Sequence, residues 1–516
     1  MRRRLSIFAA LSVSVASALD IIPAPRKIAE RGGVFVAVED AAAVAAKETA
    51  DSSLPPEGYV LSVETNGIAI RHADAAGAFY ARQTLRQIAV RSGGRWTYPC
   101  VEISDWPSYR WRGAMLDEGR HFFGKETVRR MLDLMARYKF NVFHWHLTED
   151  QGWRLDVPGY PRLARCGGMR RRSPAHGADV IIRAKYDCEM TEYNTERYGP
   201  FFYTADDVRE IVAYARERHI EVVPEIEMPG HTLAALGAYP EFACFPERIR
   251  AGEAGDKWGI SRNVICVGND SAVRFLERTL DFVCELFPSK VVHIGGDECP
   301  RLNWEECPKC RARMKAEGLK DANGLQAWIT ARMARYLAKK GRRAMGWDEI
   351  LGGDVPKDVI GQSWRTEAEH GAGTELVSGA AGAARGFDMV MSPLTKCYYS
   401  YMQGLKEEPF PRNGPNLTLE TAYSFDPVQG VPENARAHVL GGQCCLWGEY
   451  IWNRYDLEWR MWPRAMAMAE VLWTAPSNRD FADFSRRAAV LRKRLVSEGV
   501  NCAPLGLPEP CGQRDL

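Results

Sequence analysis

The 516-residue sequence has no low-complexity tract, no block of basic residues and no apolar run long enough to cross a membrane. Its formal net charge is only +2, with 26% charged and 46% hydrophobic residues. That composition is typical of a soluble globular protein, and it gives no reason to expect a nucleic-acid or membrane partner. The length allows a large catalytic domain and a smaller one.

The first eighteen residues have the pattern of a signal peptide. Arg2, Arg3 and Arg4 precede a mostly apolar stretch over residues 5–15, and Ala16-Ser17-Ala18 fits a small-residue cleavage site. No cysteine lies near that site, so a lipid anchor is not expected. We therefore expect residues 1–18 to be removed and the protein to be exported, to the periplasm or the extracellular space.

The fourteen cysteines fit an exported protein, but in a chain this long they do not predict a disulfide scaffold. Cys307-Pro308-Lys309-Cys310 has the spacing of a zinc ligand pair, and Cys299 lies nearby. Zinc held with a fourth ligand from elsewhere, a local disulfide and buried free thiols all remain open. Cys444 and Cys445 lie within an apolar strand pattern and are expected to pack.

Residues 19–105 are predicted to form a small N-terminal α+β domain. Residues 59–63 and 67–70 alternate like paired strands, and residues 75–90 have helical periodicity. The segment carries no catalytic constellation. We expect it to support the rest of the chain.

From residue 106 onward, short strands alternate with helices or loops, which predicts an α/β fold built from βα units. One helix is expected at 125–139, one from a capping box at Thr204 to about 219, and one from Ser271. The eight predicted strands cover residues 112–116, 141–147, 220–228, 291–294, 343–347, 359–364, 387–391 and 439–447. We interpret residues 106–500 as a (β/α)8 (TIM) barrel catalytic domain that ends in a helix over 481–496, with 501–516 as a tail. The long stretch from 154 to 203 is expected on the rim of the site.

The chain is organised around the stretch from Val291 to Glu298. An apolar run leads into Gly295-Gly296 and then into the adjacent carboxylates Asp297 and Glu298, which would lie at the carboxyl end of a strand. An isolated acidic pair is more often a solvated turn. Here it is one of several polar or aromatic positions at or just beyond predicted strand ends: Arg120, Glu149, His231, Asp297, Glu298, Trp347, Trp364, Tyr398, Trp447 and Glu449.

Residues from so many different strands, converging on one barrel face, are hard to explain by core formation alone. Aromatic walls with interspersed carboxylates and an arginine suit a sugar, whose C–H faces pack on rings and whose hydroxyls need directional partners. His144 and His146 share one face of a strand and could bind a metal, but no third ligand is apparent. We expect both, and His293, to be buried imidazoles hydrogen-bonded to neighbours, and we expect no metal or cofactor in the site.

These motifs resemble glycoside hydrolase family 20, the β-N-acetylhexosaminidases. The resemblance is carried by His293-x-Gly-Gly-Asp297-Glu298, by residues 111–117 with Arg120-His121-Phe122-Phe123, by residues 144–153 and by residues 224–231. Gly77-x-x-Tyr80-x-x-Gln83-Thr84-Leu85 is similar to the family's N-terminal domain.

The resemblance implies retaining hydrolysis in which the substrate's own 2-acetamido group is the nucleophile. Glu298 would be the general acid and base, and Asp297 would orient the acetamido group. By the same resemblance Arg120 and Glu449 would bind sugar hydroxyls, and Tyr398 the acetamido oxygen. Trp347, Trp364 and Trp447 would wall the pocket, and Glu149 and His231 would form a polar chain to Glu298.

The expected activity is therefore exo-hydrolysis of terminal β-linked GlcNAc or GalNAc from glycans. The alternatives are a disaccharide-releasing, lacto-N-biosidase-like member and a non-catalytic glycan-binding protein on the same scaffold. An intact Asp297-Glu298 pair argues against the latter. Many members have Asp where Glu149 stands, and Ser400 replaces an Asp expected near the outer hydroxyls. The GlcNAc/GalNAc preference, the natural glycan, its linkage and the oligomeric state stay open.

Overall fold

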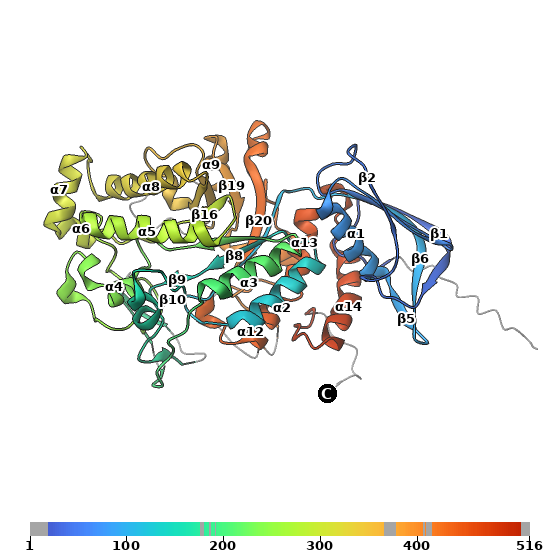
Figure 1. Ribbon diagram of the computed structural model, residues 1–516, viewed down its shortest axis with the longest axis horizontal. Coiled ribbons are helices and arrows are strands. Elements are labelled where there is room, and N and C mark those ends of the chain that lie inside the picture. Colours follow the sequence, from blue (N-terminus) through green and yellow to red (C-terminus); the bar gives the residue numbers. More distant parts are fainter. Residues whose placement is uncertain are drawn as a thin grey trace, which may run out of the picture.

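A computed structural model describes residues 19–175, 180–184, 187–190, 192–365, 378–405, 408 and 415–506 of the chain. The predicted signal peptide and the last part of the predicted tail lie outside these residues. Among the helices that are described, none has both the length and the apolarity needed to cross a membrane. Figure 1 shows a sheet-containing N-terminal part at one side of a larger part in which helices surround a barrel.

The N-terminal part is an antiparallel-rich sheet covered by one helix. Its strand order is β1-β6-β3-β4-β2, and β5 pairs with β6. The predicted strand pair is present as β3 and β4, which are antiparallel neighbours, and the predicted helix is α1. The elements are β1 (Lys27–Ala37), β2 (Lys47–Ala50), β3 (Tyr59–Glu64), β4 (Gly67–His72), α1 (Ala75–Ile88), β5 (Val90–Ser92) and β6 (Arg95–Asp105).

Strands β1 and β6 have no clear alternation in the sequence, for identifiable reasons. Almost all of β1 is exposed, and its pairing with β6 shifts register between Glu30 and Val34. Strand β6 contains Pro99, which lacks the backbone N–H that a ladder normally uses. Local pattern therefore predicts only the half of this sheet that packs against α1.

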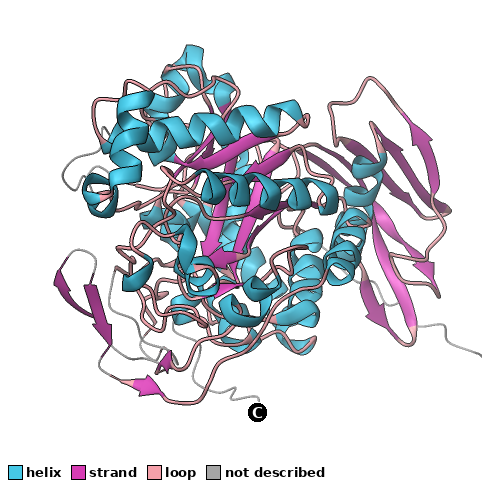
Figure 2. Cartoon of the chain, turned by 60° about the vertical axis from the view of Figure 1, so that its left-hand side comes forward, coloured by secondary structure: helices cyan, strands magenta, loops and turns pink. Residues whose placement is uncertain are grey.

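The larger part is a closed barrel of eight parallel strands, as predicted. The strands follow one another around the barrel in the order β15-β16-β17-β18-β19-β20-β7-β8. In Figure 2 these strands lie inside a layer of helices, and the N-terminal sheet stands to one side. The barrel strands are β7 (Trp111–Asp117), β8 (Val142–His146), β15 (Glu221–Glu225), β16 (Val291–His293), β17 (Arg343–Trp347), β18 (Ile360–Ser363), β19 (Asp388–Met391) and β20 (Val439–Leu446).

The barrel interior is filled rather than open. One apolar side chain from each of the eight strands joins a single buried cluster: Trp111, Val142, Val223, Val291, Met345, Ile360, Val390 and Leu440. Further along the strands the interior becomes polar, with His144, Glu225, His293, Gln362 and Gln443 all buried. The active-site candidates lie beyond this polar layer, at the carboxyl ends of the strands.

The helices of this part are α2 (Gly124–Arg137), α3 (Ala205–Arg216), α4 (Leu233–Ala238), α5 (Asp270–Leu286), α6 (Leu302–Glu306), α7 (Pro308–Ala316), α8 (Ala322–Lys339), α9 (Gly379–Ala384), α10 (Leu394–Cys397), α11 (Leu419–Tyr423), α12 (Arg454–Met461), α13 (Arg464–Trp473) and α14 (Phe481–Ser497). The capping box that predicted α3 is present, with Thr204 and Asp207 bonding to each other's backbone N–H. Helix α5 begins one residue before Ser271, because Asn269 is the N-cap.

The stretch predicted to form part of the rim contains only short elements. Among its described residues they are a π-helical turn (Leu163–Gly167), β11 (Ser173–Pro174), β12 (Val180–Ala184), β13 (Asp187–Met190) and β14 (Tyr193–Asn194), and the pair β9 (Thr148–Glu149) and β10 (Gly152–Trp153) comes just before the stretch. These strands pair only with one another, in two-stranded units outside the barrel.

Candidate active site

The loop after β16 carries the acidic pair and explains both of its glycines. Gly295 and Gly296 have φ angles of +62° and +97°. A Cβ on Gly295 would lie 1.9 Å from Glu227 Oε2, and one on Gly296 would lie 2.2 Å from Ile350 Cγ2. Any larger residue would therefore clash with a packed side chain as well as strain the backbone. The two glycines let the loop turn sharply over the barrel mouth.

The acidic pair lies further from the strand than the sequence predicts. Strand β16 ends at His293, so Asp297 and Glu298 belong to an irregular loop and not to an extended segment. Glu298 has a φ of +44° and His231, on the neighbouring loop after β15, has a φ of +49°. Left-handed backbone at residues other than glycine is uncommon and tends to occur at functional sites.

His231 links the acidic pair to the opposite side of the pocket. Its Nε2 lies 3.5 Å from Glu298 Oε2 and 3.7 Å from Asp297 Oδ2, and its Nδ1 lies 2.9 Å from Glu149 Oε1. Burial lowers the pKa of His231, but Glu149 and Asp297 raise it further, to well above its ordinary value. The ring therefore places a positive charge between carboxylates.

The surroundings of Asp297 disfavour the charged form of its carboxyl group. Burial raises its pKa and the nearby Glu298 adds to this, while His231 opposes them. The side chain of Asp297 is only 11% exposed, against 38% for Glu298. A ligand that brings positive charge close to such a carboxylate stabilises its charged form.

The other end of the pocket is built around Arg120. Its guanidinium lies 2.5 Å from Glu149, 3.2 Å from Asp117 and 4.0 Å from Glu449, and it sits 5.1 Å above the Trp447 ring. Asp117 also accepts a hydrogen bond from the Arg120 backbone N–H. The arginine is buried and fixed in place, and it presents its donors beside an aromatic face.

Four aromatic side chains, the three predicted wall tryptophans and Tyr398, lie close together at the carboxyl ends of the barrel strands. The rings of Trp347 and Trp447 are 5.4 Å apart, and Tyr398 lies 5.8 Å from Trp447. Trp364 lies nearly parallel to Tyr398, with the ring planes at 13°. Trp347 is fully buried at the base of the wall, and Trp364 is the most exposed of the four. Burial raises the pKa of Tyr398 well above its ordinary value, so its hydroxyl remains a hydrogen-bond donor.

Several polar atoms of this pocket are buried yet have no hydrogen-bond partner among the described residues. They include Asp297 Oδ1, Trp364 Nε1 and Glu449 Oε2. Buried polar atoms are normally paired, so such a group of unpaired donors and acceptors beside aromatic faces indicates a polar ligand with apolar surfaces. A pyranose with hydroxyl and amide substituents has both properties.

The three buried histidines are hydrogen-bonded imidazoles, as expected. His144 Nε2 and His293 Nδ1 lie 3.0 Å and 2.8 Å from the Glu225 carboxylate, His146 Nδ1 contacts it too, and Trp347 Nε1 donates to it over 2.8 Å. Burial alone would raise the pKa of Glu225, but the surrounding imidazoles lower it well below its ordinary value. This cluster supports the pocket from beneath and fixes the Trp347 ring.

The structure brings all ten predicted site residues to one end of the barrel. Two further carboxylates, Glu349 and Glu227, lie there too and were not predicted from the sequence. Glu349 accepts a hydrogen bond from the Glu298 backbone N–H over 3.1 Å. Burial and the nearby Asp297 raise the pKa of Glu349 to about 8. Glu227 packs against Gly295, and burial, Asp297 and Glu225 raise its pKa well above the ordinary range. Both follow barrel strands directly, so the rule that selected Glu149 would also have selected them.

Ser400 has no exposed surface, and its carbonyl accepts a hydrogen bond from Arg460. The expected grouping of three cysteines is wrong. Cys299 does not lie with Cys307 and Cys310. Those two meet Cys244 and Cys266 instead.

Comparison with known proteins identifies the family. The model of the glycosyl hydrolase family 20 catalytic domain matches residues 109–476, and that of the family's domain 2 matches residues 37–106. A β-hexosaminidase of Porphyromonas gingivalis is 39% identical over 478 residues, and one of Vibrio furnissii is 36% identical over 422. These matches cover 90% and 81% of this chain, but the chain spans only 57% and 65% of those relatives' own length.

Solved structures agree with this assignment. The exo β-N-acetylglucosaminidase of Vibrio harveyi, in complex with N-acetylglucosamine, is 30% identical, with a TM-score of 0.82 over 98% of this chain and 81% of that one. A β-N-acetylhexosaminidase of Bacteroides fragilis is also 30% identical, with a TM-score of 0.78 over 94% of this chain and 97% of that one.

Proposed function

The chain belongs to glycosyl hydrolase family 20, and we propose that it is an exo-acting, retaining β-N-acetylhexosaminidase that releases terminal GlcNAc or GalNAc from glycans. The observation that carries the proposal is the Asp297-Glu298 pair, linked through His231 and Glu149 to Arg120, at the same end of the barrel as a cluster of four aromatic rings. A glycan-binding protein would need the rings and the arginine, but it would have no use for a partly exposed acid beside a buried one.

In this proposal Glu298 protonates the glycosidic oxygen and later takes a proton from water. Its side chain is 38% exposed, so a leaving group and then water can approach it. No enzyme nucleophile is needed, because the acetamido carbonyl oxygen of the substrate attacks the anomeric carbon.

Asp297 and Tyr398 hold the acetamido group during that attack. Positive charge develops on the acetamido nitrogen as the ring closes, and the buried Asp297 carboxylate stabilises it. The Tyr398 hydroxyl, which stays protonated, donates to the acetamido oxygen and aligns it. Trp347, Trp364 and Trp447 close around the sugar and exclude water from the cyclic intermediate.

The far end of the pocket supports exo action on a single sugar. Arg120, Glu149 and Glu449 stand where the outer hydroxyls of a terminal residue would lie, and they are tied together by ion pairs. A further sugar on that side would have to displace this network. The geometry therefore favours release of one residue at a time over release of a disaccharide.

Discrimination between GlcNAc and GalNAc should be modest. Ser400 is neutral, so the negative charge in this part of the site comes from Glu449, Glu149 and Asp117, and Arg120 offsets much of it. We expect the two kcat/KM values to differ by less than about tenfold, measured on matched aryl glycosides. A thousandfold preference would show that a group outside this network reads the 4-hydroxyl.

Hydrolysis of aryl N-acetyl-β-glucosaminide and aryl lacto-N-bioside, measured side by side, tests the function. The proposal predicts release of the aryl group from the first and little from the second. Preferred cleavage of the second would identify a disaccharide-releasing enzyme, and binding of GlcNAc without cleavage of either would identify a glycan-binding protein.

The leader pattern over residues 1–18 supports export as part of the proposal. Glycans outside the cytoplasm would then be the substrates.

A further inference from the structure

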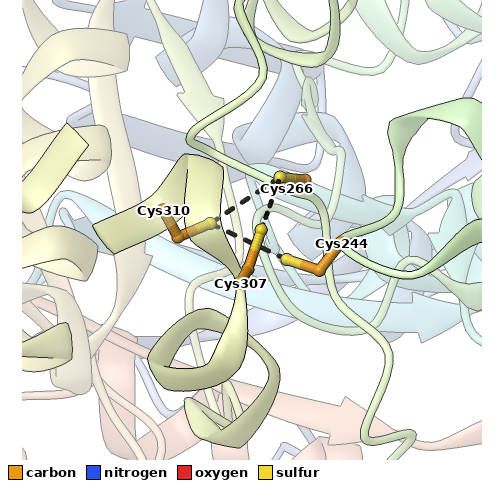
Figure 3. Close-up of side chains that lie close together, drawn as sticks. All are labelled: Cys244, Cys266, Cys307 and Cys310. Carbon is orange, nitrogen blue, oxygen red and sulfur yellow. Dashed lines mark hydrogen bonds between the residues drawn. The ribbon is translucent and has the colours of Figure 1, made fainter. Parts of the chain in front are cut away.

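Four cysteine side chains meet at a position outside the catalytic pocket. Cys244 follows a short 3₁₀ turn (Pro240–Phe242), Cys266 precedes α5, Cys307 is the N-cap of α7 and Cys310 lies in the first turn of that helix. Figure 3 shows their sulfur atoms turned toward a common centre. The four therefore come from two loops, one after β15 and one after β16.

The spacing of the sulfurs is that of ligands around one metal ion. The Sγ–Sγ distances are 3.7 Å for Cys244–Cys310, 3.7 Å for Cys266–Cys310 and 3.8 Å for Cys266–Cys307, and all four sulfurs lie within 4.8 Å of one another. A tetrahedral zinc ion with Zn–S bonds of about 2.3 Å requires sulfurs about 3.8 Å apart. A disulfide would bring one pair to about 2.0 Å and draw it away from the others.

The backbone around the cluster is shaped to bring the two loops into contact. A Cβ on Gly268 would lie 2.3 Å from the Lys309 carbonyl carbon and 2.4 Å from the Cys310 nitrogen. The turn after Cys266 thus packs directly against the Cys307–Cys310 turn, which only glycine permits. The backbone N–H of Gly268 also donates hydrogen bonds to the sulfurs of Cys266 and Cys310, and such donors stabilise negative charge on sulfur.

The position of Cys307 and Cys310 adds to this preference for negative charge. Both lie at the N-terminus of α7, where unpaired backbone N–H groups and the helix dipole stabilise anions. Pro308 occupies the first helical position and fixes the turn between the two cysteines. Cys266, Cys307 and Cys310 are buried, so a metal bound there would be shielded from water.

We propose that Cys244, Cys266, Cys307 and Cys310 form a structural zinc site. Binding replaces four S–H bonds with four Zn–S bonds, releases four protons and moves no electrons between oxidation states. With four protein ligands the metal has no open position for substrate, so its role is structural.

The zinc site would stabilise the loops at the rim of the active site. Cys307 lies nine residues after Glu298 on the same loop, while Cys244 and Cys266 belong to the loop that also carries His231. The metal would cross-link the segment that carries Glu298 to the segment that carries His231. Loss of the metal should therefore loosen the rim without removing any group that touches the sugar.

Metal content of the whole protein tests the site. Protein purified without chelators and without a nickel column should contain about one zinc per chain by inductively coupled plasma mass spectrometry. Cys310→Ser and Cys244→Ser should each lower this to a fifth or less. Cys284→Ser is the matched control, because Cys284 lies on α5 outside the cluster, and it should keep the wild-type zinc content.

Two further measurements keep the test decisive if the serine variants fail to fold. Wild-type protein produced with Co²⁺ should show the visible absorption of a tetrahedral cobalt thiolate centre, and zinc should abolish it. Intact mass under non-reducing, denaturing conditions should correspond to free thiols at all four positions. Zinc-free wild type, or masses that reveal disulfides among these cysteines, would overturn the proposal.

Discussion

Asp297 and Glu298 are adjacent in the sequence, yet their surroundings assign them different tasks. Asp297 is buried, and one of its oxygens has no hydrogen-bond partner among the described residues, whereas Glu298 is partly exposed and its backbone N–H donates to Glu349. A buried carboxylate stabilises charge and an exposed one exchanges protons. Two carboxylates therefore suffice although neither acts as the nucleophile.

Replacing the acid should separate protonation from binding. We expect Glu298→Gln to lower kcat by about 10² or more on natural glycosides, with a smaller loss on aryl glycosides whose leaving groups need little protonation. Steady-state kinetics on both substrates would measure this. Glu285→Gln, at an exposed position on α5, should behave as wild type. Equal losses on the two substrate classes would remove Glu298 from the role of acid.

At the scale of elements, the eight barrel strands each end in the site, and their sequence pattern was sufficient to predict them. Strand β17 has the predicted bounds, and the other seven differ by a few residues at their ends. The loop after β16 was harder to predict, because the left-handed backbone at Glu298 depends on contacts from β15 and the turn after β17. Pairings such as Glu349 with Glu298 join residues 51 apart, which no local pattern reveals.

The turn after β17 should make stability depend on pH. The pKa of Glu349 is about 8 in the folded protein, because of burial and Asp297, against an ordinary value near 4.5. The folded state thus holds a proton that the unfolded chain releases, so stability contributed by this group falls as pH rises from about 4.5 to 8.

Glu349→Gln should flatten that dependence, since the amide cannot ionise but can still accept the hydrogen bond. Relative to its value at pH 5, the variant should retain roughly 2 to 5 kcal/mol more stability than wild type at pH 8.5. Calorimetric unfolding at the two pH values would show this as a smaller drop in midpoint. If both proteins lose stability equally, Glu349 is ionised at neutral pH and our assignment of its proton is incorrect.

At the scale of the whole molecule, a buried ion pair ties the N-terminal sheet to the barrel. Lys139, which follows α2, lies 3.0 Å from Asp105 at the end of β6, and both side chains are fully buried. Asp105 also accepts hydrogen bonds from Tyr59 and from Trp473 of α13. Trp473 is itself part of the N-terminal hydrophobic core, so a side chain from the barrel part contributes to the core of the N-terminal part.

Breaking one side of this pair should destabilise the protein without changing its chemistry. We expect Lys139→Met to cost about 3 to 5 kcal/mol, because the buried Asp105 carboxylate loses its counter-charge. The double variant Lys139→Met/Asp105→Leu should recover part of that loss. Thermal unfolding measures the effect, and kcat of the folded fraction should stay at the wild-type value. A double variant less stable than the single one would show that the pair is a net source of stability.

The sequence could predict the barrel, the acidic pair and the resemblance that names the family, because each rests on local pattern or short motifs. It could not predict how distant loops meet. Cys244 and Cys266 stand 63 and 41 residues before Cys307, and nothing in their local sequence marks them as its partners. In the N-terminal sheet the β3–β4 pair was predicted, but β1 and β5, which pair with β6, and β2, which pairs with β4, were not.

Hydrolysis of a series of substrates with different N-acyl groups tests directly whether the substrate's own acetamido group is the nucleophile. Successive fluorination of the acetyl methyl leaves the sugar nearly unchanged in shape but makes its carbonyl oxygen a poorer nucleophile. If Asp297 and Tyr398 serve that oxygen as proposed, kcat/KM should fall steeply from acetyl through monofluoroacetyl and difluoroacetyl to trifluoroacetyl. If kcat/KM stays constant across the series, an enzyme group attacks the anomeric carbon, and the acetamido group is not the nucleophile.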